Sequence, residues 1–417
     1  MTPPLHARLF RLGLVALLAL LADAALADPK AYVGNFKDNT VSVVDTATAA
    51  VVATIAVAEG PHGMLLSPDG RTLYVSGDGS SALSVISTTT DRVARTLTVG
   101  RTPHGLAQTQ DGKRLLVAVY GEDRVAVIDT DSGRELGSVP VAKPHTIAMR
   151  PDGQRAYVAS QAPGHFALAA IDVATLKVAR ELPLDKPPRD LEFAFDGRAL
   201  YFTVAGENAV LVLDPRTDAV IARVPTGASP HIANLFRGAS AGSVVVQGPG
   251  ELTLFDPDTH LVLRSIAVGR QPHWVAAAAG GGTLFVTNEG SDDLSIVDVV
   301  KGTTRTVAVG HAPRKVVVQQ TAAVRSGANV SIANFAFVPA EVVIEAGQSV
   351  SWSNDDGAPH GLAFRDAVPG TDLLLPGARF RRRFEQAGSY DYVCSVHPYM
   401  SARVIVRALA TSLSKRE

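Results

Sequence analysis

Residues 61–76 read PHGMLLSPDGRTLYVS. A proline turn leads into a short apolar segment, the pair Asp69-Gly70 follows, and Leu73-Tyr74-Val75 begins a second apolar segment. Asp-Gly is typical of the two-residue turn that joins two twisted antiparallel strands. The stretch therefore predicts a β-hairpin that starts at Pro61.

The same pattern recurs seven times between residues 30 and 319. Successive turn prolines are separated by 42, 41, 44, 42, 42 and 41 residues, and they are Pro61, Pro103, Pro144, Pro188, Pro230, Pro272 and Pro313. Four short strands in each repeat of about 40–45 residues are typical of β-propeller blades. Three strands precede Pro61 and one follows Pro313, so we expect the last strand to complete the first blade. The sequence predicts an all-β protein with a seven-bladed propeller over residues 28–318, and this part resembles exported propellers built from Tyr-Val-Thr-Asn repeats.

The fold alone does not explain the identity of the residue that follows each turn proline. It is histidine in five repeats and arginine in two, at His62, His104, His145, His231, His273, Arg189 and Arg314. The turn before the innermost strand of a blade opens onto the central channel, so we expect these side chains to converge on one mouth. Imidazoles suit copper, and two guanidiniums favour an anion beside it. The alternative is structural, with each imidazole bonded to the backbone of a neighbouring blade and copied with the repeat.

A different pattern begins near Val330. Alternating segments separated by Gly- and Asp-containing turns predict a small β-sandwich over residues 329–408. Within it, His360 is followed 34 residues later by Cys394-Ser395-Val396-His397-Pro398-Tyr399-Met400. Cys-x-x-His-x-x-Met on a tight loop directs three ligands at one centre, and His360 reaches it from a neighbouring loop. Two imidazoles, a thiolate and a weak axial thioether are typical of a type 1 (blue) copper site, and the thioether favours copper over zinc.

This second segment resembles amicyanin and plastocyanin, which are cupredoxins. Gly388-Ser389-Tyr390-Asp391-Tyr392 before the cysteine, and His397-Pro398 followed by an aromatic residue and Met400, are most similar to amicyanin. The resemblance implies that His360 and Cys394 are buried ligands and that His397 lies near the surface as the electron port. Amicyanin has asparagine directly after its first histidine ligand. Gly361 stands there in this chain, so support for the ligand must come from elsewhere.

The order of the two domains is similar to that of nitrous oxide reductase. That family has a seven-bladed propeller with a histidine-ligated copper cluster at its hub, followed by a cupredoxin domain. Thiocyanate dehydrogenase is similar to the propeller half, with several coppers held by hub histidines, but no contiguous ligand motif of either family matches. The dinuclear centre of nitrous oxide reductase needs a second cysteine in the loop, and this chain has one cysteine. The comparison therefore implies a mononuclear centre.

Composition and the terminal segments indicate which partners are excluded and where the protein is located. Of 417 residues, 46% are hydrophobic and 19% are charged, and the net charge of -1 argues against a nucleic-acid partner. Arg8 and Arg11 precede an apolar run and then Ala25-Leu26-Ala27, which predicts a signal peptide over residues 1–27 and a periplasmic or secreted mature protein without a membrane span. Residues 319–328 are expected to link the two domains, and 409–417 to form a tail.

Three functions agree with these patterns. The leading hypothesis is an exported copper protein that transfers single electrons, with the propeller as a docking platform and a cytochrome or another cupredoxin as redox partner. The second is a copper oxidoreductase with catalytic copper at the hub histidines, fed by the cupredoxin. The third is a copper-handling or partner-binding module. The sequence also allows a homodimer in which electrons pass from one chain to the other. The sequence has no Ser-His-Asp arrangement, phosphate loop or haem Cys-x-x-Cys-His, which argues against a hydrolase, a kinase or a cytochrome.

Overall fold

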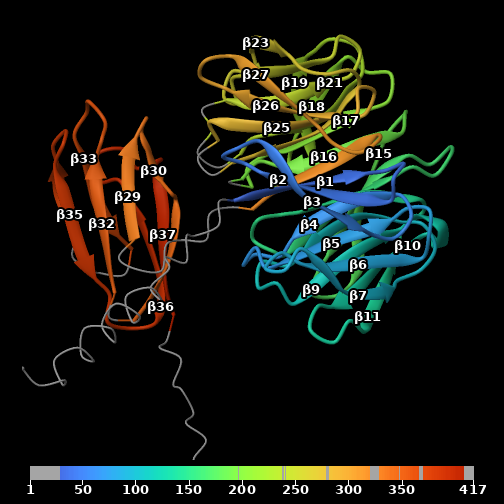
Figure 1. Ribbon diagram of the computed structural model, residues 1–417, viewed down its shortest axis with the longest axis horizontal. Helices are drawn as coiled ribbons and strands as arrows, with labels where there is room; N and C mark the ends of the chain where they lie inside the picture. The colour runs from blue at the N-terminus through green and yellow to red at the C-terminus, as the bar shows by residue number, and fades with distance from the viewer. Residues whose placement is uncertain are drawn as a thin grey trace, which may run out of the picture.

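The repeats fold into seven four-stranded antiparallel sheets, and a β-sandwich follows them (Figure 1). This computed structural model describes residues 29–319, except 196, 237–238, 240 and 279–280, and residues 328–407, except 347 and 366–369. The predicted signal peptide over residues 1–27, residues 320–327 of the predicted linker and the predicted tail over 409–417 lie outside these ranges. Within them, no helix is long and apolar enough to cross a membrane.

Each blade contributes four consecutive strands, apart from the first, which takes its innermost strand from the end of the repeats. The first blade consists of β28 (Pro313–Val318), β1 (Lys30–Asn35), β2 (Thr40–Asp45) and β3 (Ala50–Ala56). The second and third consist of β4 (Pro61–Leu66), β5 (Thr72–Gly77), β6 (Ala82–Ser87), β7 (Arg92–Thr98), β8 (Pro103–Gln108), β9 (Arg114–Val119), β10 (Arg124–Asp129) and β11 (Glu135–Pro140), with the 3-10 turn η2 (Tyr120–Glu122) after β9. The fourth and fifth consist of β12 (Pro144–Met149), β13 (Arg155–Ser160), β14 (Ala167–Asp172), β15 (Lys177–Pro183), β16 (Pro188–Phe193), β17 (Leu200–Val204), β18 (Ala209–Asp214) and β19 (Ala219–Pro225). The sixth and seventh consist of β20 (Pro230–Asn234), β21 (Gly242–Val246), β22 (Glu251–Phe255), β23 (Val262–Ala267), β24 (Pro272–Ala277), β25 (Thr283–Asn288), β26 (Asp293–Asp298) and β27 (Thr303–Ala308).

The prediction that the last strand completes the first blade is confirmed. β28 pairs antiparallel with β1, so the two ends of the repeat region share one sheet. The seven strands that begin with a turn proline also contact one another in sequence, from β4 around to β28 and back to β4. Pairing the ends in this way removes open sheet edges between the first and last blades. The result is a closed seven-bladed propeller.

The apolar repeat pattern reflects packing between blades. The second and third strands of a blade, such as β9 and β10, are buried over four or five consecutive residues, because both faces of the sheet contact neighbouring blades. The outermost strands, such as β7, are mostly exposed. A polar residue at the end of the second strand of a blade can stabilise the hairpin that follows it. Buried Asn35 donates to Thr40 and Ser42 across the hairpin that joins β1 to β2.

Glycine follows histidine where neighbouring blades approach most closely. A Cβ atom at Gly63 would lie 2.0 Å from the carbonyl oxygen of His104 in the next blade, and one at Gly105 would lie 2.6 Å from that of His145. Real Cβ atoms do not come so near to a backbone oxygen. The glycines of the Pro-His-Gly triplets in β4 and β8 therefore allow the innermost strands of successive blades to approach closely.

The carboxyl-terminal sandwich has two sheets. One has the strand order β30 (Ala336–Val338), β29 (Ala328–Ala333), β32 (Ser349–Asn354) and β35 (Arg379–Arg383). The other has the order β31 (Glu341–Glu345), β37 (Ser401–Arg407), β36 (Gly388–Val393), β33 (His360–Phe364) and β34 (Thr371–Leu374). Trp352 and Tyr392 fill the core between them and share a hydrogen bond of 3.0 Å from the indole nitrogen to the phenol oxygen. The fold prediction is confirmed for both parts of the chain.

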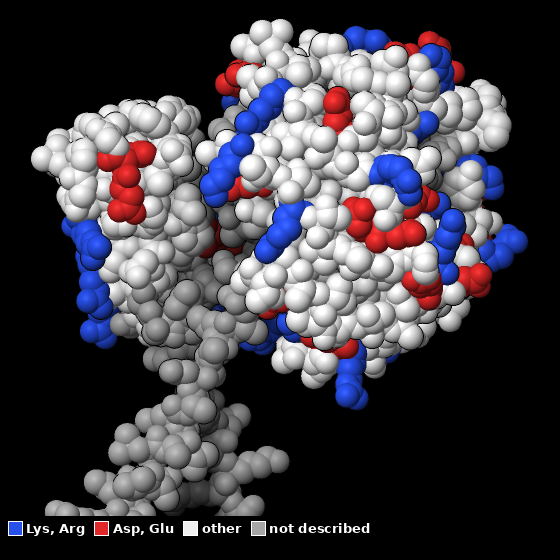
Figure 2. All heavy atoms as spheres, turned by 45° about the horizontal axis from the view of Figure 1, so that its top comes forward, with Lys and Arg blue, Asp and Glu red and all other residues white. Residues whose placement is uncertain are grey.

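On the face of the molecule shown in Figure 2, charged side chains of both signs are interspersed. Figure 2 shows positive and negative groups on the propeller, separated by broad uncharged areas. On the sandwich, the edge strand β35 exposes Arg379, Arg381 and Arg383 in alternation with less exposed residues. Charged side chains on an edge strand disfavour pairing with a second chain.

Candidate functional site

Three of the four predicted copper ligands converge at one end of the sandwich. His360 begins β33, Cys394 directly follows β36, and His397 lies in the loop between β36 and β37. The three side chains each bring a ligand atom within 4.8 Å of the other two. Among the described residues, no other group of three His, Cys, Asp or Glu side chains meets this distance.

The separations of these atoms fit a metal centre. Cys394 Sγ lies 3.6 Å from His360 Nδ1 and 3.7 Å from His397 Nδ1, and the two nitrogens are 3.3 Å apart. Nitrogen and sulfur ligands lie about 2.0–2.3 Å from a first-row metal ion such as zinc. Three donors about 2.1 Å from a central ion and 120° apart would be separated from one another by about 3.6 Å. Two imidazole nitrogens and one cysteine sulfur in such a triangle fit a type 1 copper site.

The loop that carries the cysteine is closed by its own backbone. Cys394 N–H donates to the carbonyl of Met400, and Met400 N–H donates to that of His397, both at 3.0 Å. Cys394 is fully buried, and its sulfur accepts the N–H groups of His397 at 3.3 Å and Gly361 at 3.4 Å. Such donors stabilise a thiolate. Met400, the fourth predicted ligand, is 3% exposed at the end of this loop.

The side chain that holds His360 is Asp356, which the sequence analysis did not identify. Its Oδ2 lies 2.9 Å from His360 Nε2, on the opposite side of the ring from Cys394. The expectation that support comes from a residue other than Gly361 is confirmed. The only signal in the sequence is the position of Asp356, four residues before the histidine in the loop after β32.

Of the three predicted ligands that converge, His397 is the nearest to solvent. It is partly exposed, whereas His360 and Cys394 are fully buried, as the resemblance implied. Exposed apolar side chains flank it, with Val396 42% and Tyr399 71% exposed. Phe335, from the turn after β29, packs edge-on against His397 and His360 at centroid distances of 5.0 and 5.5 Å. A ligand edge at the surface within an apolar surround is suited to contact with another protein.

The repeat histidines converge in the propeller channel, as predicted. His62, His104 and His145 form a stack with centroid distances of 3.8 Å between neighbours, and His231 lies 4.0 Å from His273. His62 lies 5.7 Å from His273, so the two groups adjoin. We call these five residues, with Arg189 and Arg314, the hub ring.

Part of the hub ring bonds to neighbouring blades, which is the structural alternative. His104 Nδ1 lies 3.1 Å from the carbonyl oxygen of His145, and His145 Nδ1 lies 3.0 Å from that of Arg189. A carbonyl oxygen only accepts, so Nδ1 carries the proton in both rings and each Nε2 keeps its lone pair. Burial lowers the pKa of His145 to about 4 and that of His231 to about 3. The imidazoles of the hub ring are therefore neutral at pH 7.

The two arginines of the hub ring already have partners. Arg314 donates to Glu289 Oε1 at 2.9 and 3.1 Å, and its guanidinium lies 3.6 Å from the centroid of Phe36. Arg189 donates to Ser229 Oγ at 2.9 Å and to Gln247 Oε1 at 3.3 Å. Because Glu289 neutralises Arg314, the hub ring is less suited to an anion than the sequence suggested.

Next to the hub ring, three further ionisable residues lie on the innermost strands β16 and β28. Asp190 is 2% exposed, and burial raises its pKa, while Lys315 from β28 has its pKa lowered by burial. Burial also raises the pKa of Glu192. No pattern in the sequence marks these three residues, although Asp190 and Lys315 each directly follow an arginine of the hub ring. Perturbed titratable groups gathered in one channel are characteristic of functional sites.

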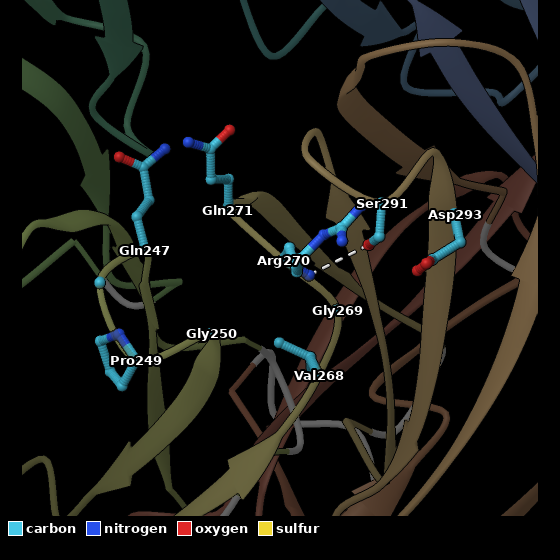
Figure 3. A pocket seen from close by; sticks show the side chains of 10 residues that line it. Gln247, Pro249, Gly250, Val268, Gly269, Arg270, Gln271, Ser291 and Asp293 are labelled. Carbon is cyan, nitrogen blue, oxygen red and sulfur yellow. Dashed lines mark hydrogen bonds between the residues drawn. The ribbon is translucent and has the colours of Figure 1, made fainter.

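An open depression lies on the same side of the propeller as the proline turns. It is lined by the turns that follow β21, β23 and β25, including Gln247, Arg270 and Gln271. In the view of Figure 3, the side chains of Gln247 and Gln271 point to the same side of the picture, and a dashed line marks the bond of 3.0 Å that Arg270 N–H donates to Ser291 Oγ. Since Gln247 also accepts from Arg189, the depression borders the hub ring.

Comparisons with known proteins decide the family of the sandwich. The family model for copper binding proteins of the plastocyanin/azurin family matches residues 324–407. Amicyanin-alpha of Methylorubrum extorquens is 36% identical over 83 residues, which are 18% of this chain and 69% of that protein. Through this segment, the chain belongs to the plastocyanin/azurin family.

Other relatives agree on the cupredoxin domain. Amicyanin of Paracoccus versutus is 37% identical over 82 residues, and chloroplastic plastocyanin of Tetradesmus obliquus is 40% identical over 84 residues. The matches cover 18% and 17% of this chain, and the chain spans 62% and 58% of the length of these two relatives. The cupredoxin domain is thus homologous to electron carriers, and copper is the metal that its family binds.

The propeller has relatives of its own. The family model for YNCE-like beta-propellers matches residues 12–107. Hydrazine synthase of Kuenenia stuttgartiensis superposes with a TM-score of 0.59 at 20% identity, covering 64% of this chain and 91% of that one. The dihydro-heme d1 dehydrogenase NirN in complex with DHE superposes with a TM-score of 0.55 at 15% identity, covering 70% and 75%. At these identities the likeness concerns the fold alone.

Proposed function

We propose that this chain is an exported, periplasmic or secreted protein that transfers single electrons through one type 1 copper ion held by His360, Cys394, His397 and Met400. The triangle of two imidazole nitrogens and one buried sulfur is the observation that supports this proposal. The propeller serves as the platform on which a redox partner docks. A copper ion bound here would supply a one-electron step between Cu(II) and Cu(I).

The residues around the triangle suit electron transfer better than catalysis on a bound molecule. The burial of His360 and Cys394 excludes water from the donors. The N–H groups on Cys394 Sγ and the closed loop hold the donor set in place, so little rearrangement accompanies a change of charge. His397 and Tyr399 form the edge through which a partner would make contact. Such a partner is a cytochrome or another cupredoxin, which would exchange one electron without breaking a substrate bond.

Spectroscopy of the full chain tests the proposal. The copper-loaded chain should show the intense visible absorption of a copper–thiolate bond and exchange electrons with a cytochrome. Cys394→Ser, which keeps a small polar side chain but removes the sulfur, should lose this absorption. Absorption that survives in Cys394→Ser would refute the ligand assignment. A blue protein that never exchanges electrons with a carrier would point to copper handling instead.

A second candidate function is supported by unpartnered atoms at the hub ring. Asp190 Oδ1 and His231 Nδ1 are buried without a hydrogen-bond partner, and His231 Nδ1 lies 3.4 Å from Asp190 Oδ2. Buried polar atoms that lack partners are costly unless a ligand or ion satisfies them. A neutral imidazole and an aspartate side chain are ligands that copper takes. The hub would then be the catalytic site of a copper oxidoreductase that receives electrons from the cupredoxin domain.

Metal content separates the two candidates. If the hub ring binds copper, a Cys394→Ala chain loaded with copper and freed of excess should retain at least one copper ion. The Cys394→Ala, Asp190→Asn double variant should then retain less. The matched control is Cys394→Ala with His165→Gln, because His165 is exposed outside the hub ring. A Cys394→Ala chain that retains no copper would assign the hub ring a structural role.

A further inference from the structure

The two nitrogens of His360 have different surroundings. Nδ1 faces Cys394 Sγ and His397 Nδ1 within the triangle, whereas Nε2 lies 2.9 Å from Asp356 Oδ2. A nitrogen that ligates a metal carries no proton, so the proton of the neutral ring lies on Nε2. His360 therefore donates this proton to a carboxylate while its other nitrogen faces the metal site.

Asp356 is held in place independently of the histidine. Its two oxygens accept the N–H groups of Asn334 at 2.6 Å and Phe335 at 2.8 Å. Its own N–H donates to Asn354 Oδ1 at 3.0 Å. The Asp356 side chain is 12% exposed, so little water competes for the carboxylate. The acceptor for His360 is thus oriented by three backbone groups rather than by the metal.

The position after the histidine cannot take this role. Gly361 has no side chain, and its N–H donates to Cys394 Sγ instead. Among the described residues, the polar partner on the far side of the His360 ring is Asp356. Among the described hydrogen bonds, the one to this carboxylate is therefore the one that orients Nε2 of the imidazole.

We propose that Asp356 is a positioning residue that fixes the tautomer of His360 and lowers the reduction potential of the copper site. A carboxylate acceptor makes the opposite nitrogen of the imidazole a stronger donor. A stronger donor and a nearby negative charge stabilise Cu(II) more than Cu(I). This inference rests on the proposed copper site, but its first test does not require copper.

The first test uses the metal-free full chain. Nitrogen NMR should find His360 as the Nε2–H tautomer, and Asp356→Asn should lose this preference because an amide can either donate or accept. Asp355→Asn is the matched control, since Asp355 is the adjacent aspartate and its side chain accepts the hydroxyls of Ser331 and Ser353 rather than bonding to His360. An unchanged His360 tautomer in Asp356→Asn would overturn the positioning role, whatever metal the site takes.

The second test uses the copper-loaded chain. Asp356→Asn should weaken Cu(II) binding by about 10- to 100-fold, the usual effect of removing such a partner. If Cu(I) binding weakens tenfold less than Cu(II) binding, the reduction potential rises by about 59 mV. Asp355→Asn should leave the potential unchanged. A purely structural role would lower the unfolding temperature of Asp356→Asn with no change in potential, and that result would overturn the tuning role.

Discussion

The hub ring should make the propeller sensitive to acid. Burial lowers the pKa of His145 to about 4, whereas a histidine in an unfolded chain titrates near 6.5. Between these two values the unfolded state binds more protons than the folded state, so the free energy of unfolding falls as the pH falls. The contribution of His145 is therefore complete at pH 7 and is progressively lost toward pH 4.

The size of the effect follows from the same two values. Between pH 7 and pH 5, protonation of the unfolded chain at His145 lowers the free energy of unfolding by about 2 kcal/mol. His231, with a pKa lowered to about 3, contributes a similar loss. Asp190 acts in the opposite direction, because its raised pKa favours the folded state as the pH falls. The comparison of a variant with the parent chain cancels this opposing contribution.

The assay compares His145→Gln with the parent chain, both free of metal. Glutamine can still donate to the Arg189 carbonyl but does not titrate. Unfolding in urea is monitored by hydrogen exchange of peptides from the propeller. This readout distinguishes unfolding of the propeller from unfolding of the sandwich. At pH 7 the parent should be the more stable, and by pH 5 this advantage should shrink by about 2 kcal/mol. In His165→Gln, which alters an exposed histidine, the difference should not depend on pH. A pH-independent difference for His145→Gln would refute a buried, neutral hub ring.

Three further outcomes are expected. Gly63→Ala should lower the free energy of unfolding by about 3 kcal/mol, because its Cβ would collide with the His104 carbonyl, whereas Gly282→Ala meets open space; equal thermal stability of the two variants would contradict the close approach of blades. Tyr399→Ser should slow electron exchange with a cytochrome in stopped-flow mixing and leave the visible absorption intact, because Tyr399 is 71% exposed; an unchanged rate would exclude this edge as the contact. Asn354→Ala should destabilise the sandwich by about 2 kcal/mol in urea unfolding, since the carbonyls of Ala358 and Leu374 lose their donor; a loss below about 0.5 kcal/mol would argue against that bonding.

Periodic features of the sequence predicted the fold well. Proline turns about 42 residues apart and Asp-Gly hairpins reflect local backbone preferences, so they marked the blades without knowledge of distant contacts. The count of strands before Pro61 and after Pro313 predicted the closure of β28 onto β1. Cys394, His397 and Met400 could be predicted as ligands because metal ligands on one short loop keep a fixed spacing.

Residues whose function depends on contacts between segments were not predicted. Asp356 is one of two adjacent aspartates in its loop, and only the fold brings its carboxylate to His360 Nε2. The pairing of Arg314 with Glu289 joins residues 25 positions apart. Asp190 and Lys315 come from different blades, and their perturbed pKa values arise from burial that periodicity does not reveal.

A reductive titration of the copper-loaded full chain tests the central claim most directly. Electrons are added in measured amounts without oxygen while the visible absorption is recorded. The proposed site predicts that the copper–thiolate absorption disappears after one electron for each such centre and returns on reoxidation. A copper-loaded chain without this absorption, or with absorption that a reductant does not change, would contradict one-electron transfer through His360, Cys394, His397 and Met400.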